Sequence, residues 1–161
     1  MWHYSVKKHR LQKFIAAVKP YRFTAVQKKL PYSADAKGFC KGGENMKIFI
    51  DPGHGGSSIG ASYKGRKEQD DCLRLCIAVK SILETQEDVE VMLSREDNIN
   101  PSITERAAAA NMWDADYFIS VHRNAFSPNK ASGVEAWIYS RTKEGGPSYK
   151  KAKEIVDNIC E

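Results

Sequence analysis

The stretch Ile-Phe-Ile-Asp-Pro-Gly-His-Gly-Gly, residues 48–56, predicts how the chain folds. Its first three residues favour a short buried strand, because β-branched and aromatic side chains pack well on a pleated surface. Pro52 cannot extend a hydrogen-bonded ladder and biases Asp51 toward extended geometry, so the strand is expected to end there. The glycines around His54 allow a tight turn and a close approach of the backbone to a ligand. Open α/β sheets place their sites at the carboxyl ends of strands, which makes His54 a candidate zinc ligand.

Predicted strands and helices alternate along the chain on either side of this loop. A helix with one apolar stripe runs from about Lys67 to Glu84, and a capping box formed by Ser102 and Glu105 opens another helix. The other predicted elements are strands at 47–51, 89–93, 116–122 and 133–139, and a helix at 148–160. Alternation of this kind implies βαβ crossovers. We therefore expect a three-layer α/β fold with an open, mainly parallel or mixed sheet and helices on both faces.

Residues 1–45 differ from the rest of the chain in charge. They carry ten basic and two acidic residues, a net charge of +8, whereas residues 46–161 carry a net charge of −3. Only a weak helical stretch near 8–18 is visible in the first segment, so we expect a disordered basic leader. The sequence Gly-Gly-Glu-Asn before Met46 back-translates to a purine-rich stretch that resembles a bacterial ribosome-binding site. Met46 is therefore the expected start, residues 1–45 are expected to be translated upstream sequence, and the domain is expected to span 46–161.

Several function classes lack their sequence signals. The acidic body gives no electrostatic case for nucleic acid, and no apolar run approaches the roughly 20 residues that span a bilayer. The glycine loop lacks the third glycine of a dinucleotide motif, and the chain has no Gly-x-Ser-x-Gly of a serine hydrolase. The four cysteines form no Cys-x-x-Cys pair, and Cys72 and Cys76 are expected to be small core residues of a helix.

The strongest chemical signal is a pair of histidines. His54 and His122 are the only histidines in the body of the chain, and each follows a predicted strand. The carboxyl ends of parallel strands share one edge, so both imidazoles are expected to face one cavity. A catalytic zinc site takes three protein ligands and keeps a fourth position for water. The third ligand is expected to be a carboxylate; Glu68 fits best because it opens the helix after the loop, and Asp70 and Asp71 remain alternatives.

The motifs that match a known family occur in order along the body of the chain. They are Asp51 to Gly56, Gly60-Ala61, Glu68-x-Asp70 with Leu73, Ser94-Arg95, Arg106 with Ala110-Asn111, Ser120 to Ala125, and Gly133 to Glu135. Together they resemble the zinc-dependent N-acetylmuramoyl-L-alanine amidases, the bacterial and phage cell-wall hydrolases that include autolysins and endolysins. The resemblance implies hydrolysis of the amide between muramic acid and the L-alanine of the peptidoglycan stem peptide. It also implies one catalytic Zn²⁺ held by His54, Glu68 and His122.

The same resemblance raises a question about the general base. Family members carry it as a glutamate on a further strand, and no matching motif precedes Glu161, so we expect a domain that lacks its final strand and has doubtful activity. Glu135, the only glutamate on a predicted strand after His122, is a weaker candidate and is better explained as a rim residue. Arg123 and Asn124 are candidate substrate-binding residues. The alternative function is a truncated fragment that binds peptidoglycan or zinc without turnover.

The expected location follows from the absence of a recognisable signal peptide at the N-terminus. We expect synthesis in the cytoplasm and action on the cell wall after release or lysis.

Overall fold

The computed structural model describes residues 2–6, 21–26, 45–123, 133–138 and 144–160. In residues 2–6 and 21–26, and at Cys160, the description covers the backbone alone. The strands are β1 (Trp2–Val6), β2 (Tyr21–Val26), β3 (Met46–Pro52), β4 (Ser62–Tyr63), β5 (Arg66–Lys67), β6 (Val89–Leu93), β7 (Tyr117–Arg123) and β8 (Val134–Ile138). The helices are α1 (Glu68–Leu83), α2 (Ile103–Met112) and α3 (Pro147–Cys160).

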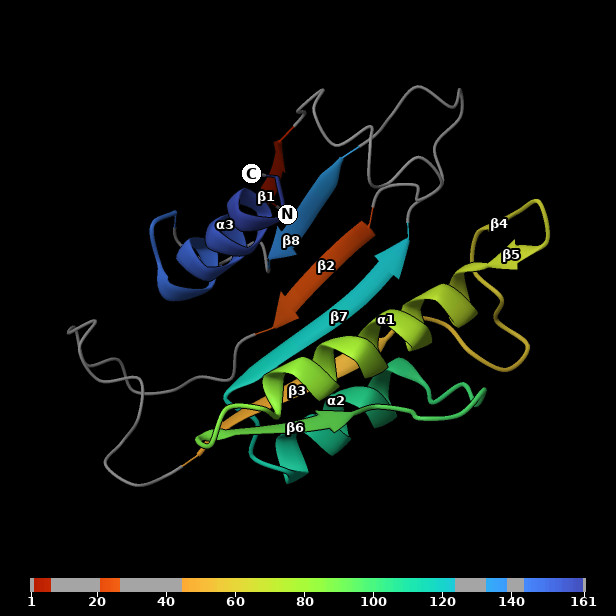
Figure 1. Ribbon diagram of the computed structural model, residues 1–161, viewed down its shortest axis with the longest axis horizontal. Helices are drawn as coiled ribbons and strands as arrows, with labels where there is room; N and C mark the ends of the chain where they lie inside the picture. Colours follow the sequence, from red (N-terminus) through yellow and green to blue (C-terminus); the bar gives the residue numbers. More distant parts are fainter. Residues whose placement is uncertain (1, 7–20, 27–44, 124–132, 139–143, 161) are drawn as a thin grey trace.

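Six strands form one mixed sheet in the order β1-β8-β2-β7-β3-β6 (Figure 1). Strand β3 is second from one edge of the sheet and runs parallel to both of its neighbours, β6 and β7. Strand β2 is parallel to β8 and antiparallel to β7, and β1 is antiparallel to β8. The short strands β4 and β5 form a separate hairpin. The open mixed sheet confirms the expected α/β fold class.

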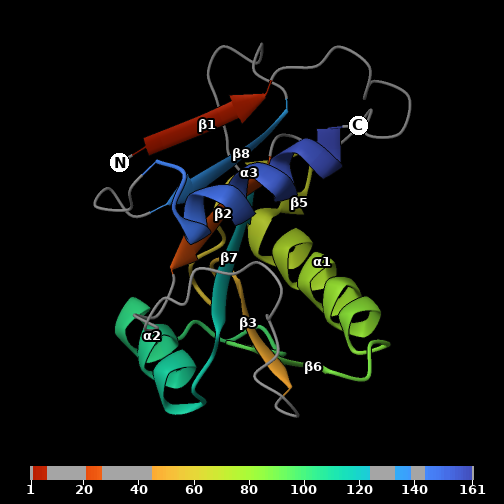
Figure 2. The same ribbon diagram turned by 90° about the vertical axis from the view of Figure 1, so that its left-hand side faces the viewer.

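Helices cover both faces of the sheet, as the sequence predicts. Alternate residues of β3 face opposite layers, so Ile50 packs with Cys76 of α1 while Phe49 packs with Ala110 of α2. Figure 2 shows α1 and α2 on opposite sides of the strands. Phe49 is fully buried, and burying a side chain of this size stabilises the fold by roughly 1.5–3 kcal/mol.

Helix α3 lies on the same face as α1. Val121 of β7 and Ala136 of β8 occupy one row of the sheet, because both are paired with Phe23 of β2. Val121 belongs to the cluster under α1, and Ala136 belongs to a second cluster with Val156 of α3. The two helices therefore cover adjacent halves of one face, and α2 covers the other face.

The predicted elements of the body agree with the structure to within one or two residues. The capping box that opens α2 is present: the Ser102 hydroxyl accepts from the Glu105 backbone N–H, and the Glu105 carboxylate accepts from the Ser102 N–H. Cys72 and Cys76 are both fully buried, as expected of core residues. No helix in the described part of the chain is long and apolar enough to span a bilayer.

The structure differs from the prediction in residues 1–45, where the sequence indicated no strand. Both β1 and β2 lie in this segment, and β2 is inserted between β7 and β8. The aromatic and β-branched residues of Tyr21–Val26 suit a strand, but the partners that make it one lie about a hundred positions away. The helical stretch near 8–18 falls outside the described residues, and the boundary at residue 45 and the start at Met46 stay predictions.

Candidate metal centre

The first element of the site is the glycine loop that follows β3. His54 has a φ of 61°, which is uncommon for a residue other than glycine. The loop is closed by two backbone hydrogen bonds between Gly55 and Ser58, each with a donor–acceptor distance of 2.9 Å. A side chain at Gly55 would place Cβ 1.9 Å from the carbonyl oxygen of Ile99, so only glycine fits at this position. The sequence of the loop thus dictates a tight turn that projects the His54 imidazole.

The second element is the end of β7, which carries His122. The backbone N–H of Gly53 donates to the carbonyl of Val121 at 2.9 Å, which holds the glycine loop beside this strand. A Cβ at Gly53 would lie 2.5 Å from the His122 ring, so the absence of a side chain there makes room for the imidazole. The ring centroids of His54 and His122 are 4.9 Å apart. Two strands that are parallel neighbours therefore bring together histidines 68 positions apart, as expected.

The third element is Glu68, the first residue of α1, which is 4% exposed. Its two carboxylate oxygens accept from the backbone N–H groups of Ala61 and Arg123, each at 2.7 Å. The structure separates it from the two alternatives that the sequence left open. Asp70 is exposed, and Asp71 is buried in ion pairs with arginines, so neither joins the two histidines.

The geometry of His54, Glu68 and His122 could hold a metal ion. The Glu68 Oε1 atom lies 3.4 Å from His54 Nε2 and 3.2 Å from His122 Nδ1. Ligands about 2.0–2.1 Å from a tetrahedral zinc ion are roughly 3.3 Å from one another, so both distances fit a shared ion. One ligand atom from each of the three residues lies within 4.8 Å of the others. The imidazole side chains are 27% and 30% exposed, which leaves an open side for water or a substrate.

The electrostatics of His54 and Glu68 favour the protonation states that bind a metal. Burial lowers the pKa of His54, and the repulsion of His122 and Arg106 adds to this effect, whereas the attraction of Glu68 opposes it. Burial by itself would raise the pKa of Glu68, but hydrogen bonds from His122 and from two backbone N–H groups outweigh burial and lower it. A neutral imidazole and an ionised carboxylate are the forms that coordinate a cation. The His54 Nδ1 atom also lies 3.0 Å from Ser58 Oγ, which leaves Nε2 facing Glu68.

The other predicted site residues lie away from this group. The side chain of Arg123 is 3% exposed and forms an ion pair with Asp71 behind Glu68, so this arrangement does not favour the predicted contact with substrate. Asn124 falls outside the described residues. Glu135 is half-buried on β8, in the same row of the sheet as His122 but with β2 between them. Two strand spacings separate their backbones by roughly 10 Å.

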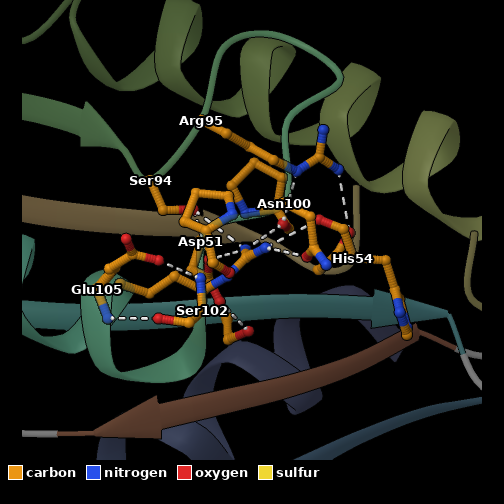
Figure 3. A network of polar contacts seen from close by, with 12 residues as sticks. Asp51, His54, Ser94, Arg95, Asn100, Ser102 and Glu105 are labelled. Atoms are coloured by element: carbon orange, nitrogen blue, oxygen red, sulfur yellow. Dashed lines mark hydrogen bonds and ion pairs between the residues drawn. The ribbon is translucent and has the colours of Figure 1, made fainter. Parts of the chain in front are cut away.

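Sequence reasoning gave no role to a network of buried polar groups under the glycine loop. Asp51, Arg95 and Arg106 form its centre, and each of these residues is less than a tenth exposed (Figure 3). The two arginines belong to the motifs of the family resemblance, but a single sequence offers little else to mark them. One sequence feature could have pointed to Arg106: it is a charged residue directly before a run of alanines in a predicted helix.

Comparisons with known proteins agree with the site. The family profile described as N-acetylmuramoyl-L-alanine amidase matches residues 48–161. The N-acetylmuramoyl-L-alanine amidase CwlM of Bacillus licheniformis is 45% identical over 95 residues, which cover 58% of this chain and 36% of that protein. The endolysin of Bacillus phage SPP1 is 37% identical over 112 residues, 70% of this chain and 41% of that protein. The chain thus spans well under half the length of these curated relatives.

Solved structures give the same result for the fold. The catalytic domain of CwlV, an N-acetylmuramoyl-L-alanine amidase from Bacillus (Paenibacillus) polymyxa var. colistinus, superposes with a TM-score of 0.53 and 29% identity, over 55% of this chain and 50% of that chain. The N-acetylmuramoyl-L-alanine amidase from Clostridium difficile 630 has a TM-score of 0.53 and 35% identity, over 55% of this chain and 49% of that chain.

Proposed function

The chain belongs to the N-acetylmuramoyl-L-alanine amidase family, and from this premise we propose that it is a zinc-dependent cell-wall hydrolase. The proposed reaction is hydrolysis of the amide between muramic acid and the L-alanine of the peptidoglycan stem peptide. The observation that carries the proposal is the meeting of His54, Glu68 and His122, whose ligand atoms lie within 4.8 Å of one another. Two imidazoles and one carboxylate with an open side are a donor set typical of catalytic zinc.

His54, Glu68 and His122 would each supply one ligand to the metal ion. A bound zinc ion would lower the pKa of its water toward about 7 and polarise the scissile carbonyl. His54 and His122 each supply a neutral imidazole nitrogen, and Glu68 supplies one negative charge that its backbone donors hold in the ionised form. The partly exposed imidazole faces leave space on the solvent side for the amide of the substrate.

A general base is the group that the described residues do not supply at the site. Apart from Glu68, no acidic residue of the described segments joins the His54–Glu68–His122 group. A base must come within about 2.6–3.2 Å of the proton that it takes, or act through one water. The backbone of Glu135 lies roughly 10 Å from that of His122 along the sheet row, so this arrangement does not favour Glu135 as the base. Without a general base the site could still bind, so the second candidate function is binding of zinc and peptidoglycan without turnover.

One experiment separates the two functions. The purified chain is incubated with defined muropeptides, with added Zn²⁺ or after removal of metal with EDTA, and free L-alanine N-termini are measured. We expect zinc-dependent release that His122→Ala abolishes, with Lys64→Ala, an exposed substitution in the nearby hairpin, as the control. Sedimentation with purified cell walls but no release of N-termini would overturn the hydrolase proposal and favour the binding function.

A further inference from the structure

Three consecutive backbone carbonyls of the glycine loop point into the protein. Those of Pro52, Gly53 and His54 accept hydrogen bonds from two buried guanidinium groups, Arg95 and Arg106. Figure 3 shows the His54 imidazole directed away from Asp51 and Arg95. Carbonyl oxygens crowded in this way repel one another, so the positive guanidinium groups stabilise the arrangement.

All five N–H groups of Arg106 have acceptors, and two of these acceptors are carbonyls of the glycine loop. Its Nε donates to the Pro101 carbonyl at 2.8 Å, and Nη1 donates to the Pro52 carbonyl at 2.9 Å. Its Nη2 donates to the His54 carbonyl at 3.0 Å and to the Asn100 side-chain oxygen at 3.2 Å. The fifth N–H group donates to Asp51. A guanidinium has five N–H groups in a fixed plane, and here each has an acceptor.

Asp51 of β3 anchors Arg106 of α2 to the sheet. Its carboxylate accepts from Arg106 Nη1 at 2.5 Å, from Ser94 Oγ at 2.5 Å and from Ser120 Oγ at 2.6 Å. These partners come from β7, from α2 and from the residue that follows β6, so the carboxylate ties three elements to the end of β3. The sheet thus holds Arg106 in place through Asp51, and Arg106 in turn holds the loop through the carbonyls of Pro52 and His54.

Arg95 holds the inner part of the same loop. Its Nε donates to the Pro52 carbonyl at 3.1 Å, and its Nη2 donates to the carbonyls of Gly53 at 3.0 Å and Gln69 at 2.8 Å. Gln69 follows the metal-binding candidate Glu68 in α1. Arg95 therefore connects the start of the helix that carries the carboxylate with the loop that carries His54.

The loop needs this restraint because His54 is in the left-handed region, with a φ of 61°. A residue with a Cβ is less stable there than in extended backbone, so hydrogen bonds to the loop carbonyls help to hold this conformation. The hydrogen bond that Arg106 donates to the His54 carbonyl acts on this very residue.

We propose that Arg106, held by Asp51 and assisted by Arg95, is a positioning residue that keeps His54 in its metal-binding orientation and so sets how tightly and how long the site holds zinc. This inference rests on the proposed zinc site. Arg106 has no contact with substrate or metal in this proposal. The rigidity of the site comes from Asp51, Arg95 and Arg106 beneath the loop.

The replacement of choice is Arg106→Lys, which keeps the charge beside Asp51 but lacks the planar fork. An ammonium group carries three donors at one point, so it cannot reach Asp51 and the carbonyls of Pro52 and His54 together. We expect the zinc dissociation constant, measured by competition with a chromogenic chelator, to rise about 10–100-fold, with a matching increase in the zinc release rate. The control is Val156→Ala, which removes a fully buried side chain of α3 and touches neither Asp51 nor the glycine loop.

The control distinguishes positioning from general stability. Val156→Ala is expected to lower the unfolding temperature of the metal-free protein while its zinc affinity stays within about threefold of the unmodified chain. Should Arg106→Lys fail to fold, Asn100→Ala serves instead, because Asn100 is exposed and bonds Arg106 Nη2. A several-fold weaker zinc affinity is expected for that variant.

Each outcome has a definite meaning. Unchanged zinc affinity in Arg106→Lys, or in Asn100→Ala if the first variant does not fold, would overturn the positioning role and leave the zinc site intact. An equal loss of affinity in Val156→Ala would also overturn it, since any loosening of the fold would then suffice. No zinc binding by the unmodified chain would overturn both the proposed function and this inference.

Discussion

The two halves of the sheet are held together by different chemistry. One half, here called the metal half, consists of β3, β6 and β7 with α1 and α2. It contains buried ion pairs, such as Asp51 with Arg106, beside an apolar core around Phe49. The other half, here called the α3 half, consists of β1, β2 and β8 with α3. Its described side chains form a small apolar cluster of Val134, Ala136, Ile138, Ala152 and Val156.

The difference indicates that the candidate site depends on the metal half, whereas the α3 half serves as scaffold. Among the described residues, all three metal-ligand candidates and the buried network beneath them belong to the metal half or to the loops at its edge. Polar groups in low dielectric hold a defined geometry but are costly if one partner is lost. Apolar contacts are less directional, so the α3 half is expected to tolerate change without disturbing the site.

The largest expected effect comes from removing a ligand in the metal half. Glu68→Ala is expected to weaken zinc binding at least about 100-fold, or ~2.7 kcal/mol, because the site loses its only negative ligand. Asp70→Ala, two positions along the same helix but exposed, is the matched control and is expected to leave zinc affinity unchanged. Competition with a chromogenic chelator measures both. A larger loss in Asp70→Ala would show that the wrong carboxylate has been assigned.

The next effect tests how closely the metal half is packed around the ligands. Gly60 and Gly65 both have positive φ, of 65° and 79°, so an alanine is strained by about 1 kcal/mol at either position. A Cβ at Gly60 would lie 2.6 Å from the His54 ring and 2.7 Å from Glu68, whereas nothing lies within 4 Å of one at Gly65. We expect Gly60→Ala to weaken zinc binding roughly tenfold or more and Gly65→Ala to lower stability alone. Equal zinc affinities in the two variants would contradict the close packing.

A third prediction concerns the α3 half. Val156 is fully buried, so Val156→Ala is expected to lower the free energy of unfolding by about 2 kcal/mol through lost burial and a small cavity. Ile159→Ala on the same helix, where the residue is 38% exposed, is expected to lose less than about 1 kcal/mol. Denaturant titration gives the stabilities, and zinc affinity should remain unchanged in both. A parallel loss of zinc affinity in Val156→Ala would show that the two halves are coupled.

The smallest effect is a dependence of stability on pH in the metal-free protein. The pKa of His54 is lowered in the folded state by burial, so the unfolded chain binds its proton at a higher pH than the folded chain does. Stability is therefore expected to fall as pH drops below the ordinary value of about 6.5. The lowered pKa of Glu68 adds a further loss at more acidic pH, below the ordinary range of a glutamate.

Denaturant titrations between pH 8 and pH 5 measure this slope. His54→Gln is expected to flatten it between pH 7 and pH 5.5, whereas Val156→Ala should shift the whole curve to lower stability and keep its shape. A slope that persists in His54→Gln would assign the titration to another group.

Local signals were sufficient for much of the metal half. The strand before Pro52, the capping box at Ser102 and the strand Val89–Leu93 were all predictable, because each depends on residues within a few positions of one another. The candidate ligands were also predictable as residue types placed at strand ends and at a helix start. The hairpin of β4 and β5 was not predicted, since two residues per strand give no periodicity to recognise.

The N-terminal strands show the limit of that reasoning. Residues 2–6 and 21–26 become strands through pairing with β8 and β7, and no pattern within the first 45 residues indicates such partners. Strand propensity depends mainly on the neighbours across the sheet, so from the sequence alone a basic segment with isolated aromatic residues resembles a leader.

By itself, the sequence determined the α/β class, the family to which the chain belongs, and the set of histidines and acids from which a metal site can be built. The tertiary structure alone decided that Glu68 faces both imidazoles while Asp70 faces solvent, and that Arg106 lies beneath the glycine loop. The physical reason is the separation in sequence over which the interactions act. Turns, caps and periodicity act over a few residues, whereas the site depends on sheet register and burial that join residues 50 to 70 positions apart.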